Sequence, residues 1–170
     1  MVRLTIDGKV VEAKKGTSIL HAAESVGIKI PTLCYIEDLL PDGSCRMCMV
    51  EIENRGRTKM ETACTAQVAE GLVVTTNSEK VRNARRNILD MLLSNHKTDC
   101  FSCPSNGDCK LQELCFEYGI ERTTYSGEQT ELPIDDSNKF FTYNPNLCIL
   151  CHRCVNTCHK IVGRGAIDTM

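Results

Sequence analysis

Twelve cysteines in a chain of 170 residues are the side chains most able to do chemistry, and all but one fall into three groups. The first group spans a long loop and includes a CxxC pair; its members are Cys34, Cys45, Cys48 and Cys64. A CxxC pair can place two thiolates on one metal centre, and two more distant cysteines can complete a site of four. Gly43 could let backbone N–H groups approach these sulfurs. Spacing alone fits structural zinc or a two-iron cluster.

The second group has a histidine where a fourth cysteine would be expected. It lies in the stretch HKTDCFSCPSNGDC and consists of His96, Cys100, Cys103 and Cys109. Neutral imidazole is a good ligand for iron and for zinc, and its exchange for a thiolate removes one negative charge from the site. That loss tends to raise the reduction potential of a cluster, as in histidine-ligated Rieske centres. On residue chemistry alone, this group suits zinc and iron equally.

The third group is the most specific of the three. It is a CxxCxxCxxxC run made of Cys148, Cys151, Cys154 and Cys158. Such a run is typical of bacterial ferredoxins, in which closely spaced thiolates hold three corners of a four-iron cluster. The fourth cysteine ordinarily ligates the other cluster of a pair, and no second run follows before Met170. Cys158 could therefore serve an absent partner cluster or close this site locally.

Cys115 is the cysteine outside the three groups. It lies one turn after Leu111 on the apolar face of a predicted short helix, where a free cysteine commonly acts as a small buried hydrophobic residue. We therefore expect Cys115 to be part of a core and not a ligand. His21 and His152 are likewise expected to be structural or solvated, although His152 could modulate the potential of a neighbouring cluster.

The first 77 residues are predicted to fold as a small α+β roll. Strands are expected where apolar residues alternate or are β-branched, at residues 2–6, 10–13, 47–52 and 72–75. Asp7-Gly8 is a strong hairpin signal between the first two strands, and a helix is expected between a cap at Thr17 and a stop at Gly27. A long cysteine loop framed by such a roll is also how plant-type two-iron clusters are held. This context favours iron over zinc in the first group.

Two helices and a linker are predicted in the rest of the chain. The first helix covers residues 78–95, with apolar side chains at helical spacing at Val81, Ala84, Ile88, Met91, Leu92 and Leu93. Its arginines are expected to form a solvated face; they are Arg82, Arg85 and Arg86. A second helix is expected from Asp108 to Gly119, and the polar residues 121–139 are expected to be a surface linker.

Composition excludes several classes of function. The net charge is -2, with 20 basic and 22 acidic residues, so nothing indicates binding to nucleic acid or to an anionic membrane. There is no apolar run long enough to span a membrane and no apolar signal segment at the N-terminus, which predicts a cytoplasmic protein. In the reducing cytosol, dense cysteine indicates metal or redox chemistry and not a disulfide framework. The chain also lacks a nucleophile with a base and an orienting partner, a GxGxxG motif and a Walker loop, so no catalytic residue is predicted.

The three cysteine groups, in this order, resemble the N-terminal electron-relay region of a large family. Its members include multi-cluster [FeFe] hydrogenases, NAD-linked formate dehydrogenase alpha subunits and the large iron-sulfur subunit of NADH:quinone oxidoreductase. Three stretches carry the resemblance: IPTLCYIEDLLPDGSCRMCMVEIE, LLSNHKTDCFSCPSNGDCKLQELC and NLCILCHRCVNTCHK. Among the possible parent enzymes, CKLQELCFEYG is most similar to the formate dehydrogenase subunits.

The resemblance implies three iron-sulfur centres. The first group would hold [2Fe-2S] in a β-grasp ferredoxin domain at residues 1–77, and His96 with its three cysteines would hold [4Fe-4S] in a helical domain at 78–120. A linker at 121–139 would lead to a partial ferredoxin-type segment at 140–170, where Cys148, Cys151 and Cys154 hold three corners of another [4Fe-4S]. The second ferredoxin run and the catalytic domain of these relatives have no counterpart in this sequence.

The resemblance also implies a function, and the residue types leave one alternative open. The chain would relay single electrons between a redox partner and the catalytic unit of an anaerobic formate dehydrogenase or [FeFe] hydrogenase complex that is linked to NAD(P) or to ferredoxin. Its partners would be redox subunits that bind flavin and NAD or are themselves ferredoxin-like. The alternative is a zinc-stabilised interaction module without a redox role.

Overall fold

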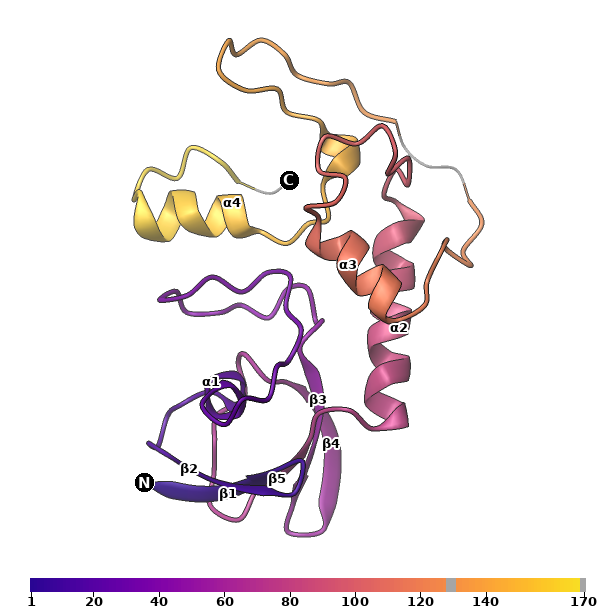
Figure 1. The fold of residues 1–170 in the computed structure, drawn as a ribbon. Coiled ribbons are helices and arrows are strands. Elements are labelled where there is room, and N and C mark those ends of the chain that lie inside the picture. Colours follow the sequence, from indigo (N-terminus) through magenta and orange to yellow (C-terminus); the bar gives the residue numbers. More distant parts are fainter. Residues whose placement is uncertain (128–130, 169–170) are drawn as a thin grey trace. The chain divides into compact units, whose positions relative to one another are not determined.

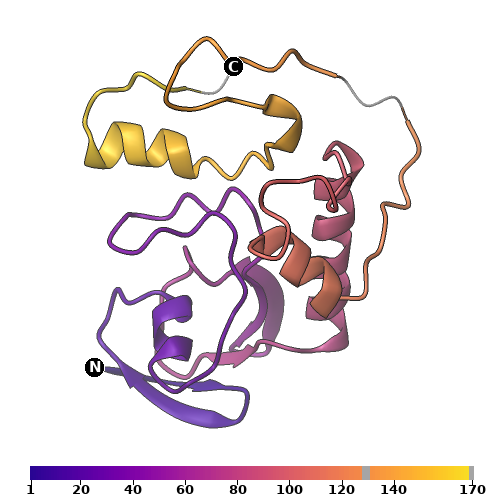
Figure 2. The same cartoon turned by 45° about the horizontal axis from the view of Figure 1, so that its top comes forward.

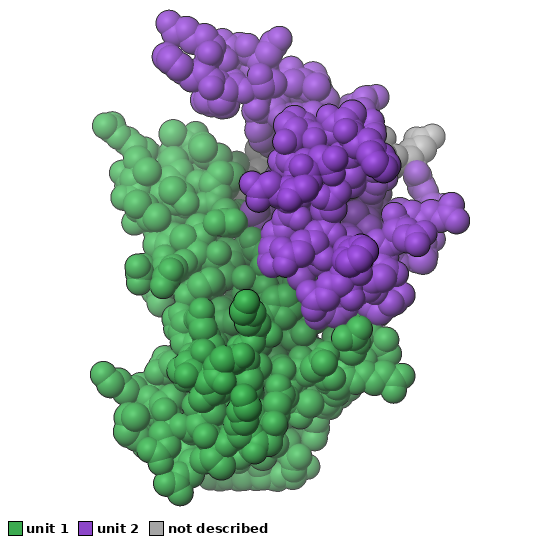
Figure 3. Space-filling view, in the orientation of Figure 1, with its two compact units in different colours: residues 1–85, 152–170 green, residues 86–151 purple. Residues whose placement is uncertain are grey.

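The computed structural model describes residues 1–127 and 131–168. The chain forms two compact units, one of residues Met1–Arg85 with His152–Met170 and the other of residues Arg86–Cys151 (Figure 3). Each unit has its own buried side chains. The four domain ranges expected from the sequence stay a prediction.

The first unit is built on a five-stranded mixed sheet (Figure 1). Its strands are β1 (Val2–Ile6), β2 (Lys9–Ala13), β3 (Met49–Asn54), β4 (Arg57–Thr62) and β5 (Val73–Thr75). They are arranged in the order β2-β1-β5-β3-β4. β1 pairs with β5 in parallel, and the other neighbouring strands are antiparallel. The sequence therefore predicted a mixed α+β unit correctly.

Two tight hairpins join neighbouring strands of the sheet. Asp7 and Gly8 both have a positive φ, of 47° and 80°, which confirms the predicted hairpin between β1 and β2. Arg55 and Gly56, with φ of 51° and 74°, make the corresponding turn between β3 and β4. β4 was not predicted from the sequence, because this edge strand is mostly polar and carries little apolar alternation.

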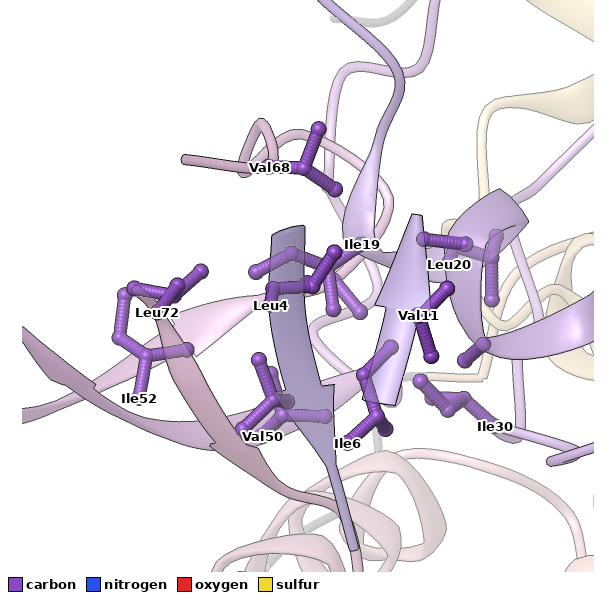
Figure 4. Close-up of a cluster of buried hydrophobic side chains, with 14 of the residues drawn as sticks. Leu4, Ile6, Val11, Ile19, Leu20, Ile30, Val50, Ile52, Val68 and Leu72 are labelled. Atoms are coloured by element: carbon purple, nitrogen blue, oxygen red, sulfur yellow. The ribbon is translucent and has the colours of Figure 1, made fainter. Parts of the chain in front are cut away.

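Helix α1 (Ile19–Glu24) covers one face of the sheet (Figures 1 and 2). Its cap is Ser18, whose Oγ accepts a hydrogen bond of 3.2 Å from the backbone N–H of His21, so the predicted cap at Thr17 was wrong by one residue. The last residue of α1 is Glu24, and the expected stop at Gly27 is confirmed: its φ is 77°, its N–H donates to the Glu24 carbonyl at 2.9 Å, and the N–H of Ile28 donates to the Ala23 carbonyl at 2.9 Å. Fully buried apolar side chains from helix and sheet form the core of this unit (Figure 4); they include Leu4, Ile6, Ile19, Val50 and Val74.

Helix α2 (Glu79–Ser94) confirms the long helix predicted over residues 78–95. The expectation of a solvated arginine face was wrong at Arg85, which is only 3% exposed. Arg85 falls one helical turn after Val81, which is fully buried, and positions four residues apart share a face. Its guanidinium donates a hydrogen bond from Nη2 to the backbone carbonyl oxygen of Met49, at 2.7 Å. Arg82, by contrast, is exposed as predicted.

Helix α3 (Lys110–Glu117) belongs to the second unit and lies within the helix predicted from residue 108 to 119. Its buried face includes Leu111, Leu114 and Cys115. After this helix, residues 121–127 and 131–139 are mostly exposed, as expected for a surface linker. Asp90 of α2 fixes the start of that linker, because its carboxylate accepts hydrogen bonds from Thr123 and Thr124.

A short helical segment near the C-terminus belongs to the first unit. It consists of α4 (Arg153–Asn156) and a π-helical turn, Thr157–Ile161. A single 3-10 turn, Pro145–Leu147, precedes the third cysteine group. Throughout the described residues, every helix is too short or too polar to cross a lipid bilayer.

Candidate metal centres

The first cysteine group is assembled by loops at the ends of the sheet strands. Cys34 follows α1, Cys45 and Cys48 precede β3, and Cys64 follows β4. All four are buried, with exposed fractions of 7% or less. The structure arranges them as two hydrogen-bonded pairs of thiols, Cys34 with Cys45 and Cys48 with Cys64. Loops far apart in the sequence thus converge on one buried set of sulfur atoms.

The pairing makes one thiol of each pair easy to deprotonate. The hydrogen bond from Cys45 lowers the pKa of Cys34 to about 5, and the hydrogen bond from Cys64 lowers the pKa of Cys48 to about 7. The same bonds raise the pKa of the partners Cys45 and Cys64, since these protons are held between two sulfurs. Thiolate is the form that binds metal, so the site favours the ligating state in two of its four cysteines.

Backbone amides are directed at the sulfurs of this site. The N–H of Met47 donates to Cys45 Sγ at 3.5 Å, and the amides of Leu33 and Ala63 donate to Cys45 and Cys48. The loop reaches this path through left-handed backbone at Gly43, whose φ is 68°. A Cβ at Gly43 would lie 3.2 Å from the side chain of Thr65, so a larger residue would require Thr65 to shift in addition to adopting left-handed backbone.

The pairing fits a two-iron cluster better than a single ion. A [2Fe-2S] cluster is held by four thiolates distributed over two iron atoms, whereas a structural zinc draws four ligands around one centre. The two hydrogen-bonded pairs, Cys34 with Cys45 and Cys48 with Cys64, match that distribution of four thiolates over two iron atoms.

The second group lines a cavity of about 770 Å³ in the second unit. All four predicted ligands contribute to its wall: His96, Cys100, Cys103 and Cys109. His96 lies two residues after the end of α2, and Cys109 is the residue that precedes α3. Between them the chain turns tightly, with hydrogen bonds from the Cys103 N–H to the Cys100 carbonyl and from the Asn106 N–H to the Cys103 carbonyl.

Burial favours the metal-binding form of the imidazole in this cavity. It lowers the pKa of His96, so the ring is kept neutral, which is the form that ligates iron or zinc. The donors thus fit a centre held by one histidine and three cysteines. Their role as ligands stays a prediction.

Cys115 faces the same cavity but belongs to the core of the second unit. It is 8% exposed, which confirms the predicted burial, and burial raises the pKa of its thiol to about 11. The structure therefore agrees with the view that Cys115 is a packing residue.

The third cysteine group is divided between the two units, with Cys148 and Cys151 in one and Cys154 and Cys158 in the other. Cys148 Sγ accepts a hydrogen bond from the N–H of Leu150 at 3.4 Å, and Cys158 Sγ accepts one from Ala166 at 3.2 Å. These amides act on the sulfurs as those of the first group do. The ligand role of this run, including that of Cys158, stays a prediction.

Some features of these sites were not anticipated from the sequence. The hydroxyl of Ser44 hydrogen-bonds to the Cys34 thiol, and no residue pattern singled it out. Arg46, Leu150 and His152 have left-handed backbone, with φ between 53° and 58°; at the first two of these turns the amides of Met47 and Leu150 donate to cysteine sulfurs. None of these three is a glycine, so the sequence carried no ordinary signal for that conformation.

Comparison with known proteins gives two matching families. Residues 1–79 match the family described as 2Fe-2S iron-sulfur cluster binding domain. Residues 85–124 match the family described as NADH-ubiquinone oxidoreductase-G iron-sulfur binding region. The second match contains His96, Cys100, Cys103 and Cys109. Both matches support iron-sulfur clusters as the cofactors of these two sites.

Longer proteins are similar over almost the whole chain. NADPH-Fe(3+) oxidoreductase subunit alpha of Geobacter sulfurreducens is 43% identical over 98% of this chain and 20% of its own length. NADP-reducing hydrogenase subunit HndD of Solidesulfovibrio fructosivorans is 38% identical over 99% of this chain and 29% of its own. The mitochondrial NADH-ubiquinone oxidoreductase 78 kDa subunit of Neurospora crassa is 38% identical over 95% of this chain and 22% of its own. The chain thus spans about a fifth to under a third of these relatives.

A solved structure also matches. One chain of an NAD+-reducing [NiFe]-hydrogenase in the H2-reduced state superposes with a TM-score of 0.89 and 32% sequence identity. The match covers 98% of this chain and 69% of that one. The agreement in fold therefore extends through all three cysteine groups.

Proposed function

Because the chain belongs to the iron-sulfur family that includes the large iron-sulfur subunit of NADH:quinone oxidoreductase and related hydrogenase subunits, we propose that it relays single electrons within an NAD(P)-linked oxidoreductase complex. The observation that carries this proposal is the buried double pair of cysteines, Cys34 with Cys45 and Cys48 with Cys64. The sequence contains no GxGxxG motif and no Walker loop.

Three groups of residues would hold the clusters. The four paired cysteines would hold [2Fe-2S], and His96 with Cys100, Cys103 and Cys109 would hold [4Fe-4S]. Cys148, Cys151 and Cys154 would hold three corners of a second [4Fe-4S], and Cys158 would either close this site or ligate a further cluster. Bound iron-sulfur clusters accept and release single electrons without making or breaking bonds in a substrate.

The protein's own contribution is burial and hydrogen bonding. The cysteines of the first group are shielded from water, which limits hydrolysis of iron-thiolate bonds and controls the potential. N–H donors such as Met47 stabilise negative charge on sulfur and so raise the potential. His96 contributes one neutral ligand in place of a charged one, which acts in the same direction.

The partners we propose are redox subunits that bind flavin and NAD or resemble ferredoxin, on one side, and a catalytic unit on the other. A hydrogenase is favoured as the catalytic unit by the names of two similar proteins, which are hydrogenases that reduce NADP or NAD+. Formate dehydrogenase is kept as the second candidate because of the stretch CKLQELCFEYG. Assays of NAD(P)+ reduction by the intact complex, with hydrogen and with formate as alternative donors, distinguish the two.

Anaerobic purification tests the relay itself. The expected protein is brown, contains iron and acid-labile sulfide, loses visible absorption with dithionite and gives EPR signals in the reduced state. A colourless protein that contains zinc and no sulfide would reject the proposal in favour of the zinc-stabilised interaction module.

A further inference from the structure

The C-terminal helical segment of the first unit contacts the loop that leads into the first cysteine site. The Nδ2 group of Asn156, in α4, donates a hydrogen bond of 3.1 Å to Asp42 Oδ2. His152 Nδ1 lies 3.9 Å from the same oxygen. A second contact is made by Lys160, whose Nζ donates to the backbone carbonyl oxygen of Leu40 at 3.2 Å. These contacts join parts of the chain more than 100 residues apart.

Asp42 also faces the first cysteine site through its other carboxylate oxygen. Its Oδ1 accepts hydrogen bonds from the N–H of Ser44 at 3.3 Å and from the Ser44 hydroxyl at 3.1 Å. The Ser44 hydroxyl hydrogen-bonds to the Cys34 thiol as well. One carboxylate is therefore linked on one side to a residue at the first site and on the other side to α4.

The position of Asn156 gives this link a consequence for the third group. Asn156 lies two residues from both Cys154 and Cys158, on the helical segment that carries them. A helix of only four residues, followed by a π-helical turn, has little stability of its own and depends on tertiary contacts. A hydrogen bond to a carboxylate is among the stronger contacts available to such a segment.

We infer that Asp42 is a positioning residue that holds the ligand segment of the third centre on the loop of the first. This inference rests on the proposed function, because it takes Cys154 and Cys158 to be ligands. The carboxylate acts by accepting from both sides at once, so it fixes the two ligand loops in one arrangement. The role depends on a donor opposite an acceptor and not on the identity of either side chain.

An exchange of the two side chains provides the test. In Asn156→Asp, two carboxylates face each other at the position of a hydrogen bond, which is strongly unfavourable for like charges. Adding Asp42→Asn to that variant restores a donor opposite an acceptor. Asp38→Asn is the matched control, since Asp38 lies exposed in the same loop and has no hydrogen bond with residues 131–168 of the described chain.

The readout is amide hydrogen exchange over residues 153–161 in the anaerobically reconstituted full chain, with EPR of the reduced clusters on the same samples. We expect Asn156→Asp to increase exchange by about tenfold or more, the magnitude of one charge-assisted hydrogen bond. The double variant should return to within about threefold of the native rate, a recovery of the greater part of that loss. Asp38→Asn should not differ from the native chain.

Two results would overturn the inference: unchanged exchange in Asn156→Asp, or a double variant no better protected than the single one. The EPR signals of the four-iron centres should change in Asn156→Asp and recover in the double variant. Iron and sulfide counts on the native sample separate this outcome from failure of the relay proposal. A native chain without bound sulfide would reject the relay, while the exchange rates would still report whether Asp42 holds the segment.

Discussion

The buried guanidinium of Arg85 in α2 donates a hydrogen bond of 2.7 Å to the backbone carbonyl of Met49, the first residue of β3. Met49 directly follows the ligand candidate Cys48. Helix α2 is thereby attached to the strand that leaves the first cysteine site. This contact gives a charged residue, expected on the surface, a structural role inside the first unit.

Replacement of Arg85 by methionine should destabilise the protein by about 2 kcal/mol, because it keeps the apolar stem but leaves a buried carbonyl without this donor. Denaturant unfolding followed by circular dichroism measures the change. Arg82→Met, in an exposed position of the same helix, is the control and should cost less than about 0.5 kcal/mol. Equal effects of the two substitutions would mean that the hydrogen bond to Met49 contributes no stability.

Gly43→Ala should disturb the first site more than a comparable change elsewhere. Both Gly43 and Gly56 have a positive φ, so alanine costs about 1–2 kcal/mol of backbone strain at either position. At Gly43 the new Cβ would also meet Thr65 at 3.2 Å, whereas the space at Gly56 is open. We expect about 1–3 kcal/mol of additional loss at Gly43 from overpacking.

The visible circular dichroism of the two-iron centre provides a second measurement for the same pair of variants. It should change in Gly43→Ala and stay as in the native protein in Gly56→Ala. Identical spectra in both variants would show that the contact with Thr65 does not shape the site.

His96→Ala should remove the second centre and leave the first intact. The expected loss is about four iron atoms per chain together with one four-iron EPR signal. His96→Cys should retain a cluster but lower its reduction potential, because a thiolate adds negative charge. His21→Ala, in the other unit, serves as the control for iron content. Retention of full iron and sulfide by His96→Ala would exclude His96 as a ligand.

Cys115 should contribute to stability in a way that depends on pH. Burial raises the pKa of its thiol from an ordinary value of 9.0 to about 11, so the folded state favours the protonated form. The associated stability is fully present below pH 9 and is lost as the pH rises through about 11. The difference in free energy of unfolding between the native chain and Cys115→Ala should shrink over that range.

Iron content provides a second check on this residue. Cys115→Ala should keep the iron of the native protein, whereas Cys109→Ala should lose the four-iron centre. A pH-independent stability difference would contradict the burial argument, and lost iron in Cys115→Ala would make Cys115 a ligand.

The residue types and spacings of the cysteines grouped four side chains that the structure buries together at the first site and four that line one cavity at the second, while their role as ligands stays a prediction. Cys34 and Cys64 could be grouped with the Cys45–Cys48 pair before their distance in space was known, since a cluster needs four ligands and these two flank the pair along the chain. The strand pattern of β1 and the Asp7-Gly8 hairpin were equally local signals. Such features are determined by short stretches of sequence and can be predicted without tertiary information.

The features that were predicted wrongly or not at all are those that depend on tertiary contacts. Arg85 is buried because an acceptor lies opposite it in β3, and no pattern within α2 reveals that acceptor. β4 forms because β3 offers it a hydrogen-bonding edge, although its own residues are polar. The left-handed backbone of Arg46 is similarly imposed by its surroundings, since a non-glycine residue does not favour it.

The parallel pairing of β1 with β5 closes the loop that carries the first centre. It aligns Thr5 with Val73, and every cysteine of the first group lies in the stretch between them. Separation of β1 from β5 would therefore free the whole loop between Thr5 and Val73, and with it all four cysteines at once. In a urea titration, the absorption of the two-iron centre and the circular dichroism of the sheet should be lost at the same midpoint. A centre that persists after the sheet has unfolded would show that the metal, and not the pairing of β1 with β5, keeps this loop closed.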